Sequence, residues 1–178
     1  IVDVTYEAPL LAHATMEPLN ATVLLSDDRL DVWMGSQAPY RNLLTAAEVS
    51  GLRPEQVFVH NTYLGGGFGR RSRNDEMVHA ILVAKEMDGR PVKMVWSREQ
   101  EIRHDRYRPQ AAVRMRGAVA DGKITAADIK ISCGSISRSL NGPQAAPNGI
   151  ENQAIDGFDD CPYAIPNHRI GLMLKNTN

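Results

Sequence analysis

"VFVHNTYLGGGFGRRSRNDEMVHAILVAKEMDG", residues 57–89, joins a strand, a glycine-rich loop and a helix in direct succession. Residues 57–64 are rich in β-branched and aromatic side chains, which predicts a β-strand. Asn74 or Asp75 can cap the helix that follows the loop. The apolar residues of this helix recur at helical spacing until Gly89 and Pro91 end it, namely Met77, Val78, Ile81, Leu82, Ala84 and Met87.

The loop has four glycines in the five positions 65–69, arranged around Phe68, and three arginines follow it. Backbone N–H groups exposed between a strand and a helix N-terminus favour an anion. Neither nucleotide fingerprint fits, because GxGxxG would need glycine at Arg70 and no Gly-Lys-Ser/Thr of a P-loop is present. A flexible connector is the alternative, but each glycine costs about 0.5 to 1 kcal/mol of conformational free energy. The pattern therefore favours contact with a ligand.

The remaining sequence predicts an α+β fold with a mixed β-sheet and two main helices. Alternation or short apolar runs predict strands at residues 1–7, 20–25, 30–34, 92–97, 110–120 and 123–135. The other main helix begins at Pro39 and ends at Gly51, with Leu43, Ala46, Ala47 and Ser50 on one face.

Local signals add a short helix and a turn. Ser97 and Gln100 form a capping box that starts the short helix. Asp121-Gly122 fits a tight hairpin turn. Residues 134–162 are rich in Gly, Pro, Asn and Ser, so we expect a functional or mobile loop there.

Composition narrows the class of protein. The 178 residues, 43% of them hydrophobic, suffice for one compact domain with a core. A net charge of −1 argues against a nucleic-acid partner. No apolar run approaches the roughly 18 residues of a membrane span, so we expect no membrane segment in this chain. Cys133 and Cys161 lack metal-site spacing and are expected to be ordinary buried thiols.

The ends of the chain indicate a part of something longer. The sequence opens without methionine inside an alternating run and stops at "LMLKNTN" without a turn or a cap. We therefore expect residues 1–178 to be a single domain, or a fragment of one, within a larger subunit.

Five segments, taken in order, carry a resemblance over nearly the whole chain: "HATMEPLNATV", "DVWMGSQAPY", "LGGGFGRR", "AKEMDGRPVKMVWSREQ" and "CPYAIPNHR". They are similar to the molybdenum-binding large subunit of the xanthine oxidase and aldehyde oxidase family. The Arg-Arg after Gly-Phe-Gly most resembles the bacterial branch of isoquinoline 1-oxidoreductase beta subunits and related aldehyde dehydrogenases.

The resemblance implies an oxidoreductase that hydroxylates N-heteroaromatics or oxidises aldehydes with oxygen from water. Its molybdenum would be held by a pyranopterin, typically the cytosine dinucleotide form in bacteria. Iron–sulfur clusters would lie on a partner subunit, since this chain has no cysteine array. For the compartment, the resemblance favours the periplasm over the cytoplasm.

The resemblance also implies site residues. Gln37 matches the glutamine whose amide donates to the apical oxo group of the metal, and Phe68 matches the residue that offers its backbone N–H to the same region. Gly66, Gly67 and Gly69 would keep the approach clear, and Arg70 would also contact the cofactor. The family's substrate arginine and catalytic glutamate are expected outside this chain, so no catalytic residue is assigned.

Three interpretations stay open at this stage. His13 and Glu17 have the spacing of helical metal ligands, although Pro9 and Pro18 bracket them and a loop or cofactor-edge contact is favoured. Arg70, Arg71 and Arg73 can bind phosphates, or they can be solvated or paired with Asp75 and Glu76. A non-catalytic phosphate or nucleotide module, or a purely structural interaction domain, is the alternative function.

The resemblance also bears on the substrate. Arg70, Arg71 and Ser72 stand where purine-specific relatives have a glutamate, which argues against a purine substrate.

Overall fold

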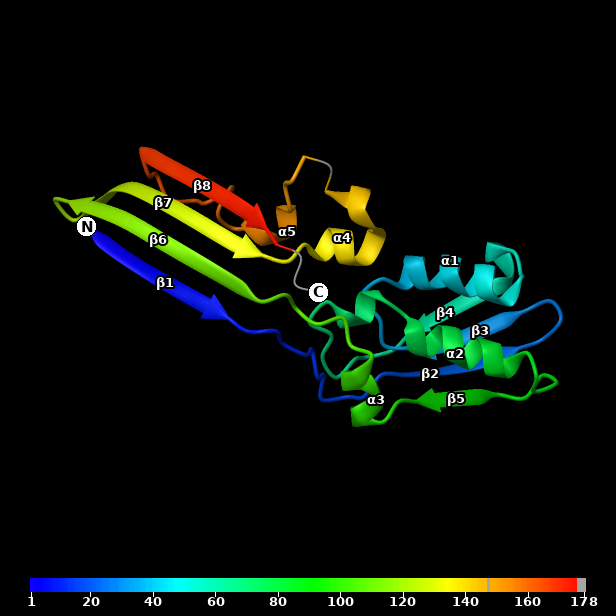
Figure 1. The fold of residues 1–178 in the computed structure, drawn as a ribbon. Helices are drawn as coiled ribbons and strands as arrows, with labels where there is room; N and C mark the ends of the chain where they lie inside the picture. The colour runs from blue at the N-terminus through cyan, green and yellow to red at the C-terminus, as the bar shows by residue number, and fades with distance from the viewer. Residues whose placement is uncertain (147, 176–178) are drawn as a thin grey trace. The chain divides into compact units, whose positions relative to one another are not determined.

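The computed structural model describes residues 1–146 and 148–175, which form two compact units (Figure 1). Residues 12–106 make one unit, which we call the loop unit because it contains the glycine loop. Residues 1–11 and the chain from residue 107 onward make the other, which we call the hairpin unit.

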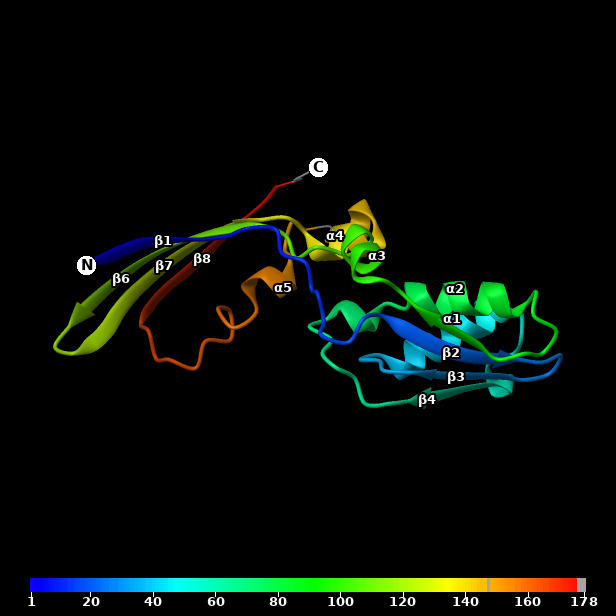
Figure 2. The same cartoon turned by 90° about the horizontal axis from the view of Figure 1, so that it is seen from below.

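The loop unit is a four-stranded mixed sheet covered by helices. Its elements are β2 (Asn20–Leu25), β3 (Leu30–Met34), α1 (Pro39–Ser50), η1 (Pro54–Gln56), β4 (Val57–Asn61), η2 (Arg70–Ser72), α2 (Asp75–Ala84), β5 (Val92–Val95) and α3 (Arg98–Arg103). The strand order is β4-β3-β2-β5, with β3 and β4 parallel and the other neighbours antiparallel. Helices α1 and α2 lie on the same face of the sheet (Figure 2).

The core of the loop unit follows from the two periodicities of the sequence. Alternate strand residues face the helices, and residues three or four apart on each helix face the sheet. The buried set comprises Ala21, Val23, Leu30, Val32, Met34, Ala46, Ala47, Val57, Met77, Ala80, Ile81 and Ala84. Both predicted main helices are thereby confirmed.

The helix ends show how local chemistry sets the boundaries. Gly51 adopts a left-handed φ of 86° and its N–H donates to the Ala47 carbonyl, which ends α1 as predicted. Helix α2 ends at Ala84, although the periodicity extends to Met87. The Met87 N–H donates to the carbonyl of Ala84, three residues back, and Asp88 then takes a φ of 47°. The last turn is therefore tightened and cannot continue the α-helix.

The hairpin unit is a second four-stranded mixed sheet. Its elements are β1 (Val2–Ala8), β6 (Ala111–Ala120), β7 (Lys123–Cys133), α4 (Ile136–Asn141), η3 (Pro143–Ala145), α5 (Asn152–Ile155) and β8 (Asn167–Leu174). The order is β1-β6-β7-β8, and only the pair β7 and β8 is parallel in this described sheet. Asp121 and Gly122 have φ of 51° and 73°, so the predicted hairpin turn is confirmed.

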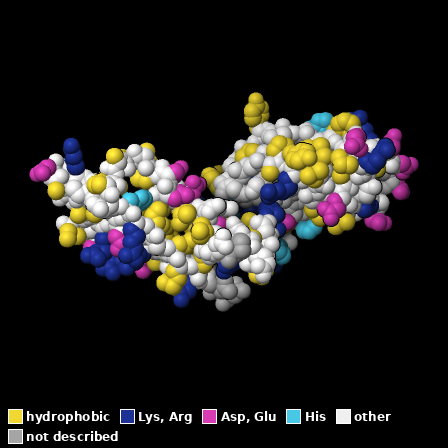
Figure 3. Space-filling view, turned by 90° about the horizontal axis from the view of Figure 1, so that it is seen from above, with side chains coloured by type: hydrophobic (Ala, Val, Ile, Leu, Met, Phe, Trp, Pro, Cys, Tyr) yellow, Lys and Arg dark blue, Asp and Glu magenta, His cyan; other side chains and the backbone are white. Residues whose placement is uncertain are grey.

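Strand alternation gives the hairpin sheet two different faces. Ile129 and Ile131 are buried on one face, against Phe158 and residues of α5. Charged side chains project from the other: Asp3, Arg114, Arg116, Asp128, Lys130 and Arg169. Lys and Arg side chains group together on this unit in the space-filling view (Figure 3).

Several boundaries differ from those expected. The α+β class with mixed pairing is confirmed, but the mixed pairing occurs in two sheets. The strand predicted at 57–64 ends at Asn61, and β8 was not predicted. Residues 134–162 are not a structureless loop, because α4, η3 and α5 lie there. The buried Glu151 carboxylate joins this segment together by accepting from the Ser135 and Ser137 hydroxyls.

Two further expectations concern cysteine and the membrane. Cys133 and Cys161 are both free thiols, but only Cys133 is buried, since Cys161 is half-buried. None of the helices in the described residues has the length and apolar character that crossing a bilayer requires.

Candidate functional site

The loop unit brings two segments together at the carboxyl ends of two neighbouring parallel strands. Residues 35–37 follow β3, and the glycine loop at 65–69 follows β4. The Thr62 N–H donates to the Met34 carbonyl at 2.9 Å, which extends the pairing beyond the strands. Ligands of α/β sheets bind characteristically outside such strand ends.

Gly35 and Ser36 hold these segments close together. A Cβ on Gly35 would lie 2.7 Å from the Cβ and 3.2 Å from the Cα of Leu64, so only glycine permits this approach. The Ser36 N–H donates to Oδ1 of Asn61 at 2.8 Å, and the Ser36 hydroxyl donates to the Arg71 carbonyl at 3.3 Å. These contacts fix the backbone directly before Gln37.

Gln37 contacts the glycine loop through its side chain. Its Oε1 accepts from the Gly69 N–H at 2.9 Å. Only the amide oxygen can accept this bond, so the NH₂ end of the amide is left to donate elsewhere. A Cβ on Gly67 would lie 2.5 Å from this same oxygen. Gly67 therefore provides the space that the Gln37 side chain occupies.

The glycine loop presents its backbone rather than side chains. Gly66 and Gly69 have φ of 98° and 95°, and Phe68 has a φ of 51° that non-glycine residues adopt rarely. Such non-glycine outliers cost about 1 to 3 kcal/mol and cluster at functional sites. Within the described part of the chain, the N–H groups of Gly66, Gly67 and Phe68 have no hydrogen-bond partner. Three consecutive donors are thus available to an acceptor, and Phe68 itself is 66% exposed.

The two arginines after the loop point into the protein. The side chains of Arg70 and Arg71 have no exposed surface. Nη2 of Arg70 lies 3.0 Å from Oδ2 of Asp75, and its Nε lies 3.2 Å from Oδ1 of Asp105. Nη2 of Arg71 lies 3.1 Å from Oε2 of Glu17. Ion pairing is therefore the observed arrangement, with Asp75 confirmed as one partner.

Asp105 joins the N-terminal segment of the loop unit to this cluster. It accepts from the backbone N–H of His13 at 2.6 Å, and its Oδ1 lies 3.0 Å from Nδ1 of the same histidine. His13 and Glu17 thus have different partners and do not lie on a helix. No group of three or more His, Cys, Asp or Glu side chains suited to a metal ion occurs among the described residues.

Glu76 is an unusual carboxylate in the first turn of α2. It is fully buried, and neither oxygen makes a well-formed hydrogen bond within the described residues. Burial raises its pKa to about 7, and the opposing effects of its own backbone N–H and of Arg70 and Arg71 do not cancel this shift. Glu76 therefore exchanges a proton near neutral pH. Nothing in its sequence position indicated this, because a glutamate in the first turn of a helix is usually exposed.

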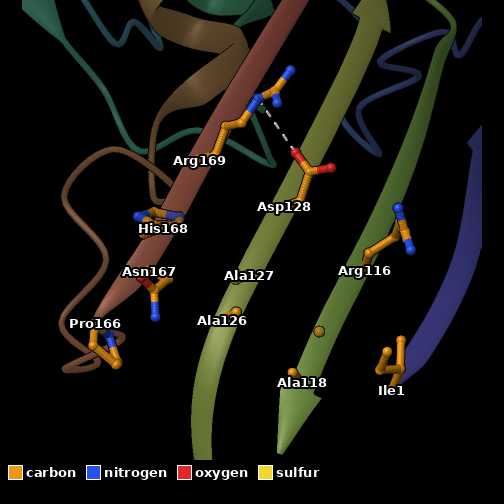
Figure 4. Close-up of a pocket in the computed structure, with 11 residues that line it drawn as sticks. Ile1, Arg116, Ala118, Ala126, Ala127, Asp128, Pro166, Asn167, His168 and Arg169 are labelled. Carbon is orange, nitrogen blue, oxygen red and sulfur yellow. Dashed lines mark ion pairs between the residues drawn. The ribbon is translucent and has the colours of Figure 1, made fainter.

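A hollow of about 630 Å³ lies on the hairpin unit, and none of the predicted site residues line it. Asp128 and Arg169 form an ion pair of 3.6 Å at its wall, and Arg116 projects on the other side (Figure 4). Much of its floor is formed by small residues such as Ala118 and Ala126. It has neither the glycine loop nor the Gln37 amide, so the loop site is the better candidate.

The geometry defines a class of protein, namely one whose glycine loop offers backbone donors, beside a glutamine amide, at the ends of two parallel strands. The family model of the molybdopterin cofactor-binding domain matches residues 1–178. The chain belongs to this family. The predicted membership in the molybdenum hydroxylase large subunits is thereby confirmed.

Individual relatives agree with this assignment. A membrane-bound aldehyde dehydrogenase (pyrroloquinoline-quinone) of Gluconacetobacter polyoxogenes is 32% identical over 92% of this chain. The isoquinoline 1-oxidoreductase subunit beta of Brevundimonas diminuta is 32% identical over 67% of it. The chain covers only 20% and 14% of these two proteins. Pyrroloquinoline quinone is named for that aldehyde dehydrogenase and is not assigned to this chain.

A solved structure shares the fold. The aldehyde oxidoreductase of Desulfovibrio gigas superposes with a TM-score of 0.68 and 21% identity, over 95% of this chain and 18% of that one. The family assignment supports cofactor binding and gives no support to the alternative of a phosphate or nucleotide module.

Proposed function

We propose that this chain forms the part of a molybdenum hydroxylase that holds one side of the molybdenum–pterin cofactor. The complete protein would oxidise aldehydes or hydroxylate N-heteroaromatic compounds, with the new oxygen taken from water. Gln37, Gly66, Gly67, Phe68 and Gly69 would line the cofactor, and Arg70 would take part in the cofactor site by holding the loop.

One observation carries this proposal: hydrogen-bond donors lie together beyond the ends of the adjacent strands β3 and β4. They are the side-chain NH₂ of Gln37 and the backbone N–H groups of Gly66, Gly67 and Phe68. Fixed donors suit an electron-rich acceptor, and hydrogen bonds around a metal centre tune its charge. The residues present therefore fit a cofactor that offers oxygen or sulfur acceptors. The bound cofactor would supply the metal's two-electron chemistry.

The finer assignments of the site are part of the same proposal. The Arg70 side chain is buried and ion-paired, so we assign its cofactor role to fixing the loop. The cofactor would be the cytosine dinucleotide form, and iron–sulfur clusters on a partner subunit would accept the electrons. Arg70, Arg71 and Ser72 stand where purine-specific relatives have a glutamate, which supports a substrate other than a purine.

The test uses the protein at its natural full length. Molybdenum and pterin are measured per polypeptide, and turnover is followed with aldehydes and N-heteroaromatics in isotopically labelled water. We expect one molybdenum per chain and label in the product. Binding of phosphate or nucleotide without molybdenum would instead favour a non-catalytic module.

A further inference from the structure

We propose that Glu17 is a positioning residue that shapes the glycine loop by tying both of its ends to one side chain. This inference rests on the proposed function, because it assigns the loop's donors their fixed geometry. Glu17 lies 48 residues before Gly65 and 54 before Arg71, so the connection exists only in the folded chain.

The first end of the loop is held at Gly65. Oε2 of Glu17 accepts from the Gly65 N–H at 2.6 Å, and the Glu17 N–H donates to the Gly65 carbonyl at 3.2 Å. A Cβ on Gly65 would lie 2.6 Å from the Cβ of Glu17. Glycine at this position is therefore needed for the contact with Glu17 rather than for a ligand.

The second end is held through Arg71. Its Nη2 lies 3.1 Å from the same Oε2 of Glu17 and donates to the Glu17 carbonyl at 2.9 Å. The backbone carbonyl of Arg71 accepts from the Gln37 N–H at 3.0 Å. Arg71 therefore connects Glu17 to Gln37, the residue after β3 whose side chain contacts the loop.

The charge of Glu17 matters because its partner is buried. Partial burial acts to raise the pKa of Glu17, but the Gly65 N–H, the Asn20 amide and Arg71 outweigh it and hold this pKa below its usual value. Ion pairs between exposed residues contribute little to stability. The Arg71 side chain has no exposed surface, however, so a neutral residue 17 would leave a buried charge without its carboxylate.

The test compares Glu17→Gln with Asp31→Asn in the full-length protein. Glutamine keeps the size and one acceptor oxygen but removes the charge opposite Arg71. Asp31 is a matched control, since it pairs with Arg29 at 2.6 Å and His60 at 2.8 Å in the same unit and makes no hydrogen bond or ion pair with the described loop residues. Amide hydrogen exchange is resolved at Gly69 and Arg70, whose N–H groups bond to Gln37 and Gly67 rather than to Glu17.

We expect exchange at Gly69 and Arg70 to accelerate about ten-fold or more in Glu17→Gln, as for loss of a charged hydrogen bond, and to stay unchanged in Asp31→Asn. The paramagnetic resonance signal of the molybdenum should also change in Glu17→Gln alone, at equal metal content. Wild-type exchange at both amides in Glu17→Gln would overturn the proposal.

Two further outcomes remain decisive. If Glu17→Gln does not fold, Glu17→Asp keeps the charge but shortens its reach, and unchanged exchange at Gly69 and Arg70 would then count against the proposal. If the wild-type protein holds no molybdenum, the proposed function fails. The exchange comparison still decides the role of Glu17, because it does not depend on the cofactor.

Discussion

The backbone N–H of Gly69 donates to Oε1 of Gln37 at 2.9 Å, between residues 32 positions apart in the chain. This bond fixes which end of the Gln37 amide faces the loop. The NH₂ end is consequently directed away from Gly69, as a donor that the loop does not use. Gly67 contributes by having no side chain where the amide lies.

Replacing Gln37 by Glu tests the donor directly. Glutamate can still accept from Gly69, but a charged acceptor replaces the NH₂ donor and repels an electron-rich cofactor group. We expect turnover per bound molybdenum to fall roughly 100-fold or more, as for loss of one positioned donor. The melting temperature should stay near that of the wild type, because Gln37 is exposed.

Gln56→Glu is the matched control for this change. Gln56 also donates through its amide, to the Asp28 carbonyl at 2.8 Å, but lies outside the site. Its substitution should leave turnover unchanged. Near-normal turnover in Gln37→Glu would remove Gln37 from the site.

Gly67→Ala should separate function from stability. The added Cβ would lie 2.5 Å from Oε1 and 2.6 Å from Cδ of Gln37, the movable end of an exposed side chain. Displacing this side chain should cost less than about 1 kcal/mol of folding free energy, while turnover falls at least as far as in Gln37→Glu. Gly117→Ala is the control, because its nearest atom is at 3.8 Å. Unaltered kinetics in Gly67→Ala would show that the Gln37 position is not required.

Glu76→Gln tests the buried carboxylate through pH. The folded pKa of about 7 lies above the ordinary glutamate value of 4.5, so the folded protein binds more protons between these two values. Stability should therefore decrease as pH rises from 4.5 to 7, by on the order of 3 kcal/mol. Glutamine cannot ionise, so the variant should be more stable than the wild type at pH 8 and similar to it at pH 5.

Urea unfolding at both pH values checks this expectation. The comparison is clean because the stability contributed by Asp31, whose pKa is lowered to about 2, is lost only as pH falls below the usual range of a carboxylate. Parallel pH profiles for wild type and Glu76→Gln would contradict a protonated Glu76.

Residues 1–178 alone should fold but bind no molybdenum and oxidise nothing. The relatives are several times longer than this chain, and the catalytic glutamate and substrate arginine are expected outside it. Circular dichroism and metal analysis of the isolated chain check both halves of this expectation. Stoichiometric molybdenum in that preparation would contradict it.

Local chemistry by itself determined most elements of the fold. Pro39 and Gly51 delimit α1, Asp121-Gly122 makes the hairpin turn, and alternation locates the strands. Each of these signals acts over a few residues, so the sequence suffices to read it. The sequence did not predict the edge strand β8, because Gly171 interrupts a weak alternation of apolar and polar residues. The pairing of β8 with β7 in the folded chain decides its structure.

The partners of the site residues were decided only by the tertiary structure. The sequence left Arg70 and Arg71 open between phosphate binding and pairing with Asp75 and Glu76. Folding retains the pair of Arg70 with Asp75 and adds Asp105 to Arg70 and Glu17 to Arg71, each more than 30 positions away. The physical reason is the antiparallel pairing of β2 with β3 and with β5, which brings the segment before β2 and the segment after β5 to the end of the sheet where β3 and β4 finish. There, burial makes a carboxylate partner necessary for each arginine.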